Sequence, residues 1–186
     1  VGRESTQGHW WKGRMQDLRF YKGIAKYTKN FSVGSNDPDV VADTPSANPY
    51  RLKPKEPVCG SVAFSERGSD NLSVQGGSDF RFGTGDFTIE GWFYISKKTY
   101  SNNCIWDLRD NGSGSAVAGY FLKCHTDNST IELRNSNGTM GSTFAKYDTW
   151  CHIAVTRNGT DVRVYVDGQP RIQSTDSTNA VGERLI

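Results

Sequence analysis

The sequence lacks the features that define several common classes of protein. No run of apolar residues approaches the roughly 18–20 that a membrane-spanning helix requires, so no membrane insertion is predicted. The formal net charge is only +2, which does not indicate a nucleic-acid partner. No G-x-S-x-G motif is present, so the nucleophile elbow of α/β-hydrolases is excluded. Apolar residues with helical spacing are missing almost everywhere, which argues against an α-helical fold.

The four cysteines do not follow the spacing of a zinc motif. They are Cys59, Cys104, Cys124 and Cys151, and no two of them form a C-x-x-C pair. Two interpretations of their redox state stay open. Cys104 and Cys124 flank predicted neighbouring strands and could therefore form one disulfide. Otherwise the cysteines are half-buried thiols of a chain made in a reducing cytosol.

Turn residues and aromatic residues are plentiful. The chain has 20 glycines and is 12% aromatic, which suits a β-sandwich core or a sugar-binding surface. Predicted short strands cover residues 10–27, 61–65, 71–74, 86–96, 103–109, 119–125, 129–135, 149–157 and 161–168. Asn-Gly or Asp-Gly pairs at 111–112, 137–138, 158–159 and 167–168 indicate hairpins. The predicted fold class is therefore all-β and antiparallel.

Residues 29–58 have a different composition. They hold five of the six prolines and show little periodicity, so we expect an extended linker between the opening strand and the body.

The body resembles the concanavalin A-like, or laminin G-like, jelly-roll superfamily. The resemblance rests on GSVAFSERGSDNLSV, FRFGTGDFTIEGWFYIS and YDTWCHIAVTRNGTDVRVYVDGQ, which occur in the family's order over about residues 60–186. It implies an antiparallel jelly-roll β-sandwich.

The same resemblance raises a question about the N-terminal strand. The family's domain closes with a strand similar to GRMQDLRFYKGIAKYT, yet here that segment is residues 13–28. The chain then divides into closing strand 1–28, linker 29–58 and sandwich body 59–186. The closing strand could serve its own domain in cis, belong to a neighbouring similar domain, or be exchanged within a tandem array, which is the favoured interpretation. A sandwich without it would leave an open sheet edge that another strand must fill.

The resemblance also suggests a structural calcium ion. In many such jelly rolls an aspartate of the closing strand helps to hold Ca²⁺, which implies Asp17, with Asp70 as a weaker second ligand. The alternative for Asp17 is an ion pair with a nearby arginine. No other cofactor is predicted.

Aromatic residues are the candidates for carbohydrate binding. A flat aromatic ring offers apolar area to a sugar at low entropic cost, and the candidates are Trp10, Trp11, Tyr21 and Tyr100. The alternative is that these rings pack in the core or cover a sheet edge. Trp92, Trp106 and Trp150 lie within strands and are predicted to be core residues.

No catalytic residue is predicted. Glycoside hydrolases of this fold carry an E-x-D-x-E strand, whereas Glu90 and Glu132 each stand alone in their strands. His125 and His152 each follow a cysteine, but adjacent strand residues face opposite sides and cannot bind one metal ion together. His152 occupies a position that is usually structural in the family.

The resemblance thus implies a non-catalytic β-sandwich of an extracellular or virion surface. Sequences with this closing motif occur in phage tail fibres and decoration proteins and in large bacterial surface proteins. The main expectation is a structural or adhesion protein whose partners are copies of itself or similar domains. The alternative is a calcium-assisted carbohydrate-binding module whose partners are surface glycans.

Overall fold

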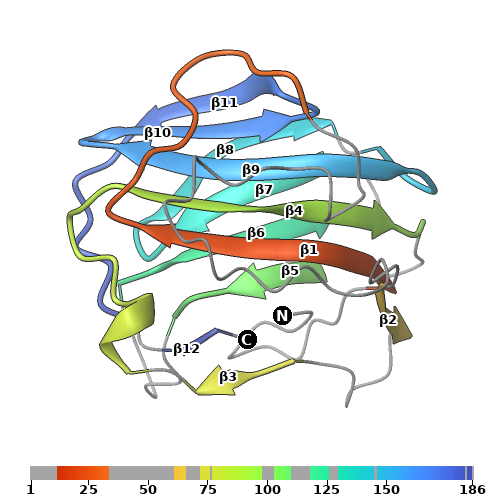
Figure 1. Ribbon diagram of the computed structural model, residues 1–186, viewed down its shortest axis with the longest axis horizontal. Helices are drawn as coiled ribbons and strands as arrows, with labels where there is room; N and C mark the ends of the chain where they lie inside the picture. The colour runs from red at the N-terminus through yellow and green to blue at the C-terminus, as the bar shows by residue number, and fades with distance from the viewer. Residues whose placement is uncertain are drawn as a thin grey trace, which may run out of the picture.

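The computed structural model describes residues 12–33, 61–65, 72–75, 77–97, 103–109, 118–125, 130–144, 146–182 and 184–185. These residues form two antiparallel sheets that pack face to face, with a small strand pair at one end (Figure 1). The six-stranded sheet has the order β11-β10-β9-β4-β1-β2, the four-stranded sheet β5-β6-β7-β8, and the small pair β12-β3. The described part of the chain contains no helix long and apolar enough to cross a membrane.

The elements of the described residues are β-strands and one short 3-10 helix. The six-stranded sheet contains β1 (Lys12–Lys22), β2 (Val62–Ser65), β4 (Phe87–Ile95), β9 (Trp150–Asn158), β10 (Asp161–Val166) and β11 (Gln169–Thr175). The four-stranded sheet contains β5 (Asn103–Asp107), β6 (Tyr120–His125), β7 (Thr130–Asn135) and β8 (Gly138–Phe144). The remaining elements are β3 (Val74–Gln75), η1 (Ser78–Phe80) and β12 (Arg184–Leu185). The all-β jelly-roll prediction is confirmed.

The core lies between the two sheets. Alternation in β4 turns Phe87, Ile89, Phe93 and Ile95 inward, where each is no more than 1% exposed. Facing strands contribute Tyr120, Leu122, Ile131 and Leu133 from the four-stranded sheet, all almost completely buried. The alternation of β4 therefore directs one row of apolar side chains into the core.

The N-terminal strand β1 lies inside the six-stranded sheet. Its residues pair with β4 from Gly13↔Ile95 to Lys22↔Phe87 and with β2 from Lys12↔Ser65 to Met15↔Val62. In this structure, then, the closing strand completes the sheet of its own chain. β1 is hydrogen-bonded on both edges over its first residues.

A segment that we call the strap, residues 23–33, follows β1 and crosses the outer face of the same sheet (Figure 1). The Tyr27 carbonyl accepts hydrogen bonds from Thr156 of β9 at 3.0 Å and from Tyr165 of β10 at 3.3 Å. The Phe31 amide donates to the Gly168 carbonyl, 3.0 Å away, beyond the end of β10. The strap is thus fixed across several strands.

The cysteines in the described residues do not form the disulfide considered from the sequence. Cys104, Cys124 and Cys151 are buried thiols. Cys104 is paired in register with Lys123, so Cys104 and Cys124 are offset by one residue and point to opposite faces of the sheet. These three cysteines are thiols, as the second interpretation proposed, but they are fully buried rather than half-buried. Cys59 lies outside the described part.

Candidate functional site

The outer face of the six-stranded sheet carries rows of side chains that run across its strands. Residues paired on neighbouring strands point to the same face, so the register defines each row. The rows are Ala63–Arg14–Tyr94–Trp150, then Gln16–Trp92–His152, then Arg19–Glu90–Ala154–Tyr165, and finally Tyr21–Thr88–Thr156–Arg163. The strap covers the last two rows and leaves the first open.

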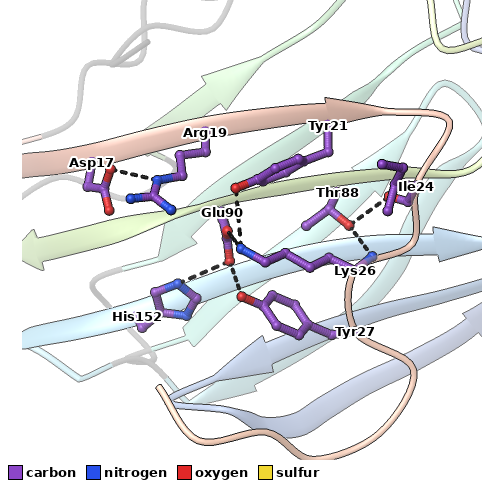
Figure 2. Close-up of polar contacts among 9 residues, drawn as sticks. All are labelled: Asp17, Arg19, Tyr21, Ile24, Lys26, Tyr27, Thr88, Glu90 and His152. Carbon is purple, nitrogen blue, oxygen red and sulfur yellow. Dashed lines mark hydrogen bonds and ion pairs between the residues drawn. The ribbon is translucent and has the colours of Figure 1, made fainter. Parts of the chain in front are cut away.

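Beneath the strap lies a buried carboxylate, that of Glu90, whose side chain is 4% exposed (Figure 2). Lys26 Nζ lies 2.6 Å from Glu90 Oε1, and the Tyr27 hydroxyl donates to Oε2 across 2.6 Å. His152 Nε2 approaches Oε2 at 3.4 Å from β9. Lys26 also donates from Nζ to the Tyr21 hydroxyl at 3.2 Å. Both carboxylate oxygens are therefore occupied.

These contacts determine the charge of Glu90. Burial alone would raise its pKa, but hydrogen bonds from His152, Lys26 and Tyr27 outweigh burial and lower the pKa from 4.5 to about 2. Burial works against the charged Lys26 as well, yet the hydrogen bond to Glu90 raises the pKa of the ammonium above its ordinary value. A carboxylate that stays ionised and saturated with donors is a poor general acid or base, so its role is to fasten the strap.

His152 completes this cluster and connects it to the aromatic residues. Its ring meets Trp92 edge to face at 5.5 Å and Phe31 of the strap at 5.8 Å. Its Nδ1 is buried without a hydrogen-bond partner among the described residues. This arrangement suits the tautomer that carries its proton on Nε2 and donates it to Glu90.

At the end of the same face that the strap does not cover lies a groove of about 450 Å³. Its lining residues are Lys12, Gly13, Arg14, Ala63, Phe64, Tyr94, Ser96 and Trp150. The Tyr94 and Trp150 rings meet at 5.9 Å with an interplanar angle of 66°, which makes an apolar corner. Both rings are half-buried, whereas Arg14 beside them is exposed. The lining thus combines two aromatic rings with the cations Lys12 and Arg14 and the hydroxyl of Ser96.

The outer face of the four-stranded sheet carries a second polar cluster around Phe121. The Arg109 guanidinium stacks 3.5 Å from the Phe121 ring centre and is paired with Asp107 at 2.8 Å. On β7, Glu132 accepts a hydrogen bond from Thr139 and lies 2.5 Å from His125 Nε2. Since Phe121 is 3% and Asp107 0% exposed, this cluster offers little accessible surface.

The predicted calcium ligand Asp17 is engaged in an ion pair. It occupies a bulge between Gln16 and Arg19 with a left-handed φ of 54°, and its Oδ1 lies 2.8 Å from Arg19 Nε (Figure 2). This contact is the alternative weighed from the sequence. Asp70 lies outside the described residues, and within them no three His, Cys, Asp or Glu side chains gather around a possible metal ion. Calcium binding stays a prediction.

The predicted sugar-binding residues are mostly outside the described part of the chain. Trp10, Trp11 and Tyr100 lie there, while Tyr21 is on the outer face beside Lys26 and the strap. The structure places Tyr21 away from the open row, so it does not bring Tyr21 to the groove.

The prediction that the strand tryptophans belong to the core is right for one and wrong for two. Trp106 is 1% exposed and packs in the core. Trp92 and Trp150 instead lie on the outer face, opposite the inward Phe93 and Cys151. The alternation of a strand could have indicated the outward position of Trp92, because residues two apart point to the same face and Trp92 is two residues from both Glu90 and Tyr94.

The two packed antiparallel sheets define a β-sandwich of the jelly-roll class. A family model described as the concanavalin A-like lectin/glucanases superfamily matches residues 66–184. The chain belongs to this superfamily, as its motifs indicate. β1 lies before the matched range.

Among solved structures, the chain is similar to carbohydrate binding module CBM66 from Bacillus subtilis. The identity is 13% and the TM-score is 0.31, with 55% of this chain and 79% of that chain covered. No significant match was found among curated proteins.

The lowered pKa of Glu90 predicts acid sensitivity. Its ion pair stabilises the fold fully above the ordinary pKa of 4.5, and this stability is lost as the pH falls through the folded-state value of about 2. We expect about 3 kcal/mol of unfolding free energy to depend on this one titration. The measurement is urea unfolding from pH 7 to pH 2 for the wild type and Glu90→Gln. The variant should be less stable at pH 7 and should lose less stability on acidification; parallel curves would contradict the assignment.

Because the strap docks against one of two turns, replacing the glycine in each turn by alanine should lower the stability of the fold by different amounts. Gly168 and Gly159 both have positive φ, at 76° and 59°, so alanine is strained at either position. A Cβ on Gly168 would lie 1.9 Å from the Phe31 carbonyl oxygen, whereas one on Gly159 meets nothing within 4 Å.

Gly168→Ala should therefore cost about 1–3 kcal/mol more than Gly159→Ala. It should also speed hydrogen exchange at the Phe31 amide. Urea midpoints and amide exchange measure both effects. Equal effects of the two variants would mean that the strap is not held against this turn.

Proposed function

We propose that the chain is a non-catalytic carbohydrate-binding module that works through the open end of the outer face of its six-stranded sheet. The observation that carries this proposal is the row Arg14–Tyr94–Trp150, which places two accessible aromatic rings and a cation beside the groove. Aromatic faces bind the apolar faces of sugar rings, and nearby polar groups orient the hydroxyls.

The position of these side chains on paired strands supports a binding role. Tyr94 and Trp150 are cross-strand partners on β4 and β9, which are central strands of the sheet. Groups mounted on strands are held more precisely than groups on loops, so the site loses little conformational entropy when a ligand binds.

The arrangement of carboxylates supports the absence of catalysis. Glycoside hydrolysis needs two carboxyl groups separated by roughly 5–9.5 Å. Glu90 and Glu132 lie on the outer faces of opposite sheets, with the core between them. Packed sheets are themselves about 10 Å apart, so these two groups cannot act on one bond.

Removing one ring of the aromatic corner tests the proposal. Trp150→Ala should weaken binding to those sugars of a glycan array that the wild type binds by at least roughly 10-fold, because about 1.4 kcal/mol of contact is lost. Phe144→Ala is the matched control, since Phe144 is 80% exposed on β8 of the other sheet. Equal affinities of the two variants, or a wild type that binds no sugar, would refute the proposal.

A second candidate function is assembly by exchange of β1. The observation that favours it is the interior position of β1, between β4 and β2. If this strand left its own sheet, it would leave a gap between two strands that the β1 strand of a neighbouring copy could fill. Residues 34–60 separate the strap from β2 and could span roughly 90 Å when extended. Such an assembly suits the extracellular or virion-surface setting expected from the sequence, as a fibre or decoration with copies of itself as partners.

The solution mass tests this second function. Exchange predicts oligomers whose mass grows with concentration in light scattering on a sizing column, and their loss when residues 1–28 are deleted. A monomer over the whole concentration range would exclude exchange and leave β1 closing its own sheet.

A further inference from the structure

We propose that the six-stranded sheet bears mechanical load: tension along the chain pulls β1 lengthwise between its neighbours, and the strap acts as a stopper that keeps β1 in place. This load-bearing role is independent of sugar binding. It is carried by the positions at which the chain enters and leaves the sheet and by the contacts that fasten the strap.

The chain enters the sheet at one end and leaves it at the other. β1 begins at Lys12 and ends at Lys22, which at about 3.3 Å per residue places these two residues roughly 33 Å apart. From Lys22 the register crosses the sheet to β11 in the row Lys22–Phe87–Arg157–Val162–Ser174. β11 ends at Thr175, directly after Ser174. β1 and β11 therefore run in the same direction, β1 starting at the first end and β11 stopping at the second (Figure 1).

Tension on the chain consequently acts along the strands and not across them. A pull before Lys12 draws β1 toward the end where it begins, and a pull after β11 draws on the opposite end of the sheet. The residues after β11 are fastened at that second end too, because the Asp176 amide donates to the Thr160 carbonyl and the Ala180 amide to the Gly83 carbonyl, each at 2.8 Å. β12 is held to β3 by two further residue pairs.

Lengthwise pulling loads the hydrogen bonds of β1 together. Backbone hydrogen bonds of an antiparallel pair lie perpendicular to the strands. A strand pulled along its axis must therefore break its bonds to both neighbours at once, whereas a strand peeled from one end breaks them one after another. β1 is paired with β4 from Gly13 to Lys22 and with β2 from Lys12 to Met15. These pairs resist tension in the stronger of the two geometries.

The strap adds to this resistance because it follows β1 directly and is fastened across the same sheet. If β1 moved toward the end where it begins, residues 23–33 would have to move with it. The Gly23 amide donates to the Asp86 carbonyl at 2.7 Å, and the Lys26 amide donates to the Thr88 hydroxyl at 2.8 Å. Both contacts would have to break before β1 could slide.

Glu90 provides the charged fastening of the strap. The Lys26 ammonium and the Tyr27 hydroxyl each reach the Glu90 carboxylate at 2.6 Å, as Figure 2 shows. Charge-assisted hydrogen bonds are roughly twice as strong as neutral ones. Glu90 belongs to β4, the strand past which β1 would have to slide, so it ties the strap to the track along which β1 is pulled.

Single-molecule pulling in two directions tests the load-bearing role. Handles at residues 1 and 186 apply tension lengthwise to β1. In the second direction, the handle at residue 186 is replaced by one on Thr149→Cys in a Cys59→Ser background, since the other three cysteines are buried. Thr149 is exposed and precedes Trp150, which shares a row with Arg14 where β1 begins, so this pull peels β1 from that end. Lengthwise rupture should need at least roughly 2-fold more force at the same loading rate.

Two carboxylate variants test the part of the strap. Glu90→Gln removes the charge that fastens the strap and should lower the lengthwise rupture force by at least roughly a third, with a smaller change in the peeling force. Glu132→Gln is the matched control, because Glu132 is a buried carboxylate of the other sheet with His125 and Thr139 as its partners. It should leave the lengthwise force unchanged. If Glu90→Gln fails to fold by circular dichroism, Tyr27→Phe removes one donor to the same carboxylate and provides the comparison.

Three outcomes would overturn the proposal. Equal rupture forces in the two directions would show that β1 is not loaded lengthwise. A Glu90→Gln variant that resists lengthwise tension as the wild type does would remove the stopper role of the strap. Glu132→Gln that weakens lengthwise resistance as much as Glu90→Gln would mean that rupture follows overall stability and not the path of the load. None of these results depends on whether the groove binds sugar.

Discussion

Strand β1 is hydrogen-bonded to β4 on one edge and to β2 on the other, and both faces of the six-stranded sheet depend on this insertion. Its inward residues, among them Met15 at 6% exposure, contribute to the core. Its outward residues include Arg14, which joins the groove, and Tyr21, which contacts Lys26. The strap begins where β1 ends. One strand thus closes the sheet, positions the candidate site and leads into the segment that covers the rest of the outer face.

Two unlike surfaces result on a single sheet face. Under the strap, every oxygen of Glu90 has a donor and the charges are neutralised locally, which produces stability without a reactive group. Beyond the strap, aromatic rings and Arg14 stay accessible. The description of the superfamily names both lectins and glucanases. In this chain the Glu90 carboxylate fastens the strap, and we propose that the open aromatic row binds sugar.

Much of the fold was predictable because β-strand alternation and tight turns are local. The period of two in β4 separated Phe87 and Ile89 from Thr88 and Glu90, and the Asn-Gly pairs located the β7–β8 and β9–β10 turns. β8 and β11 were missed because both are edge strands with mostly exposed residues, and Pro170 in β11 is tolerated only at such an edge. The Lys26–Glu90 ion pair joins residues 64 apart, a relationship that no local pattern carries. The prediction that Trp92 and Trp150 are core residues is wrong because it relied on their hydrophobicity and not on the outward face to which strand alternation assigns them.

The claim that matters most is that residues 12–33 of each chain complete and cover its own sheet. Hydrogen–deuterium exchange on a dilute sample, shown to be monomeric by its mass, tests this claim directly. The amides of β1 should be protected as strongly as those of β4 and β9, and the Phe31 amide in the strap should be protected as well. Rapid exchange throughout residues 12–33 in the monomer, with protection only at concentrations where oligomers form, would contradict it.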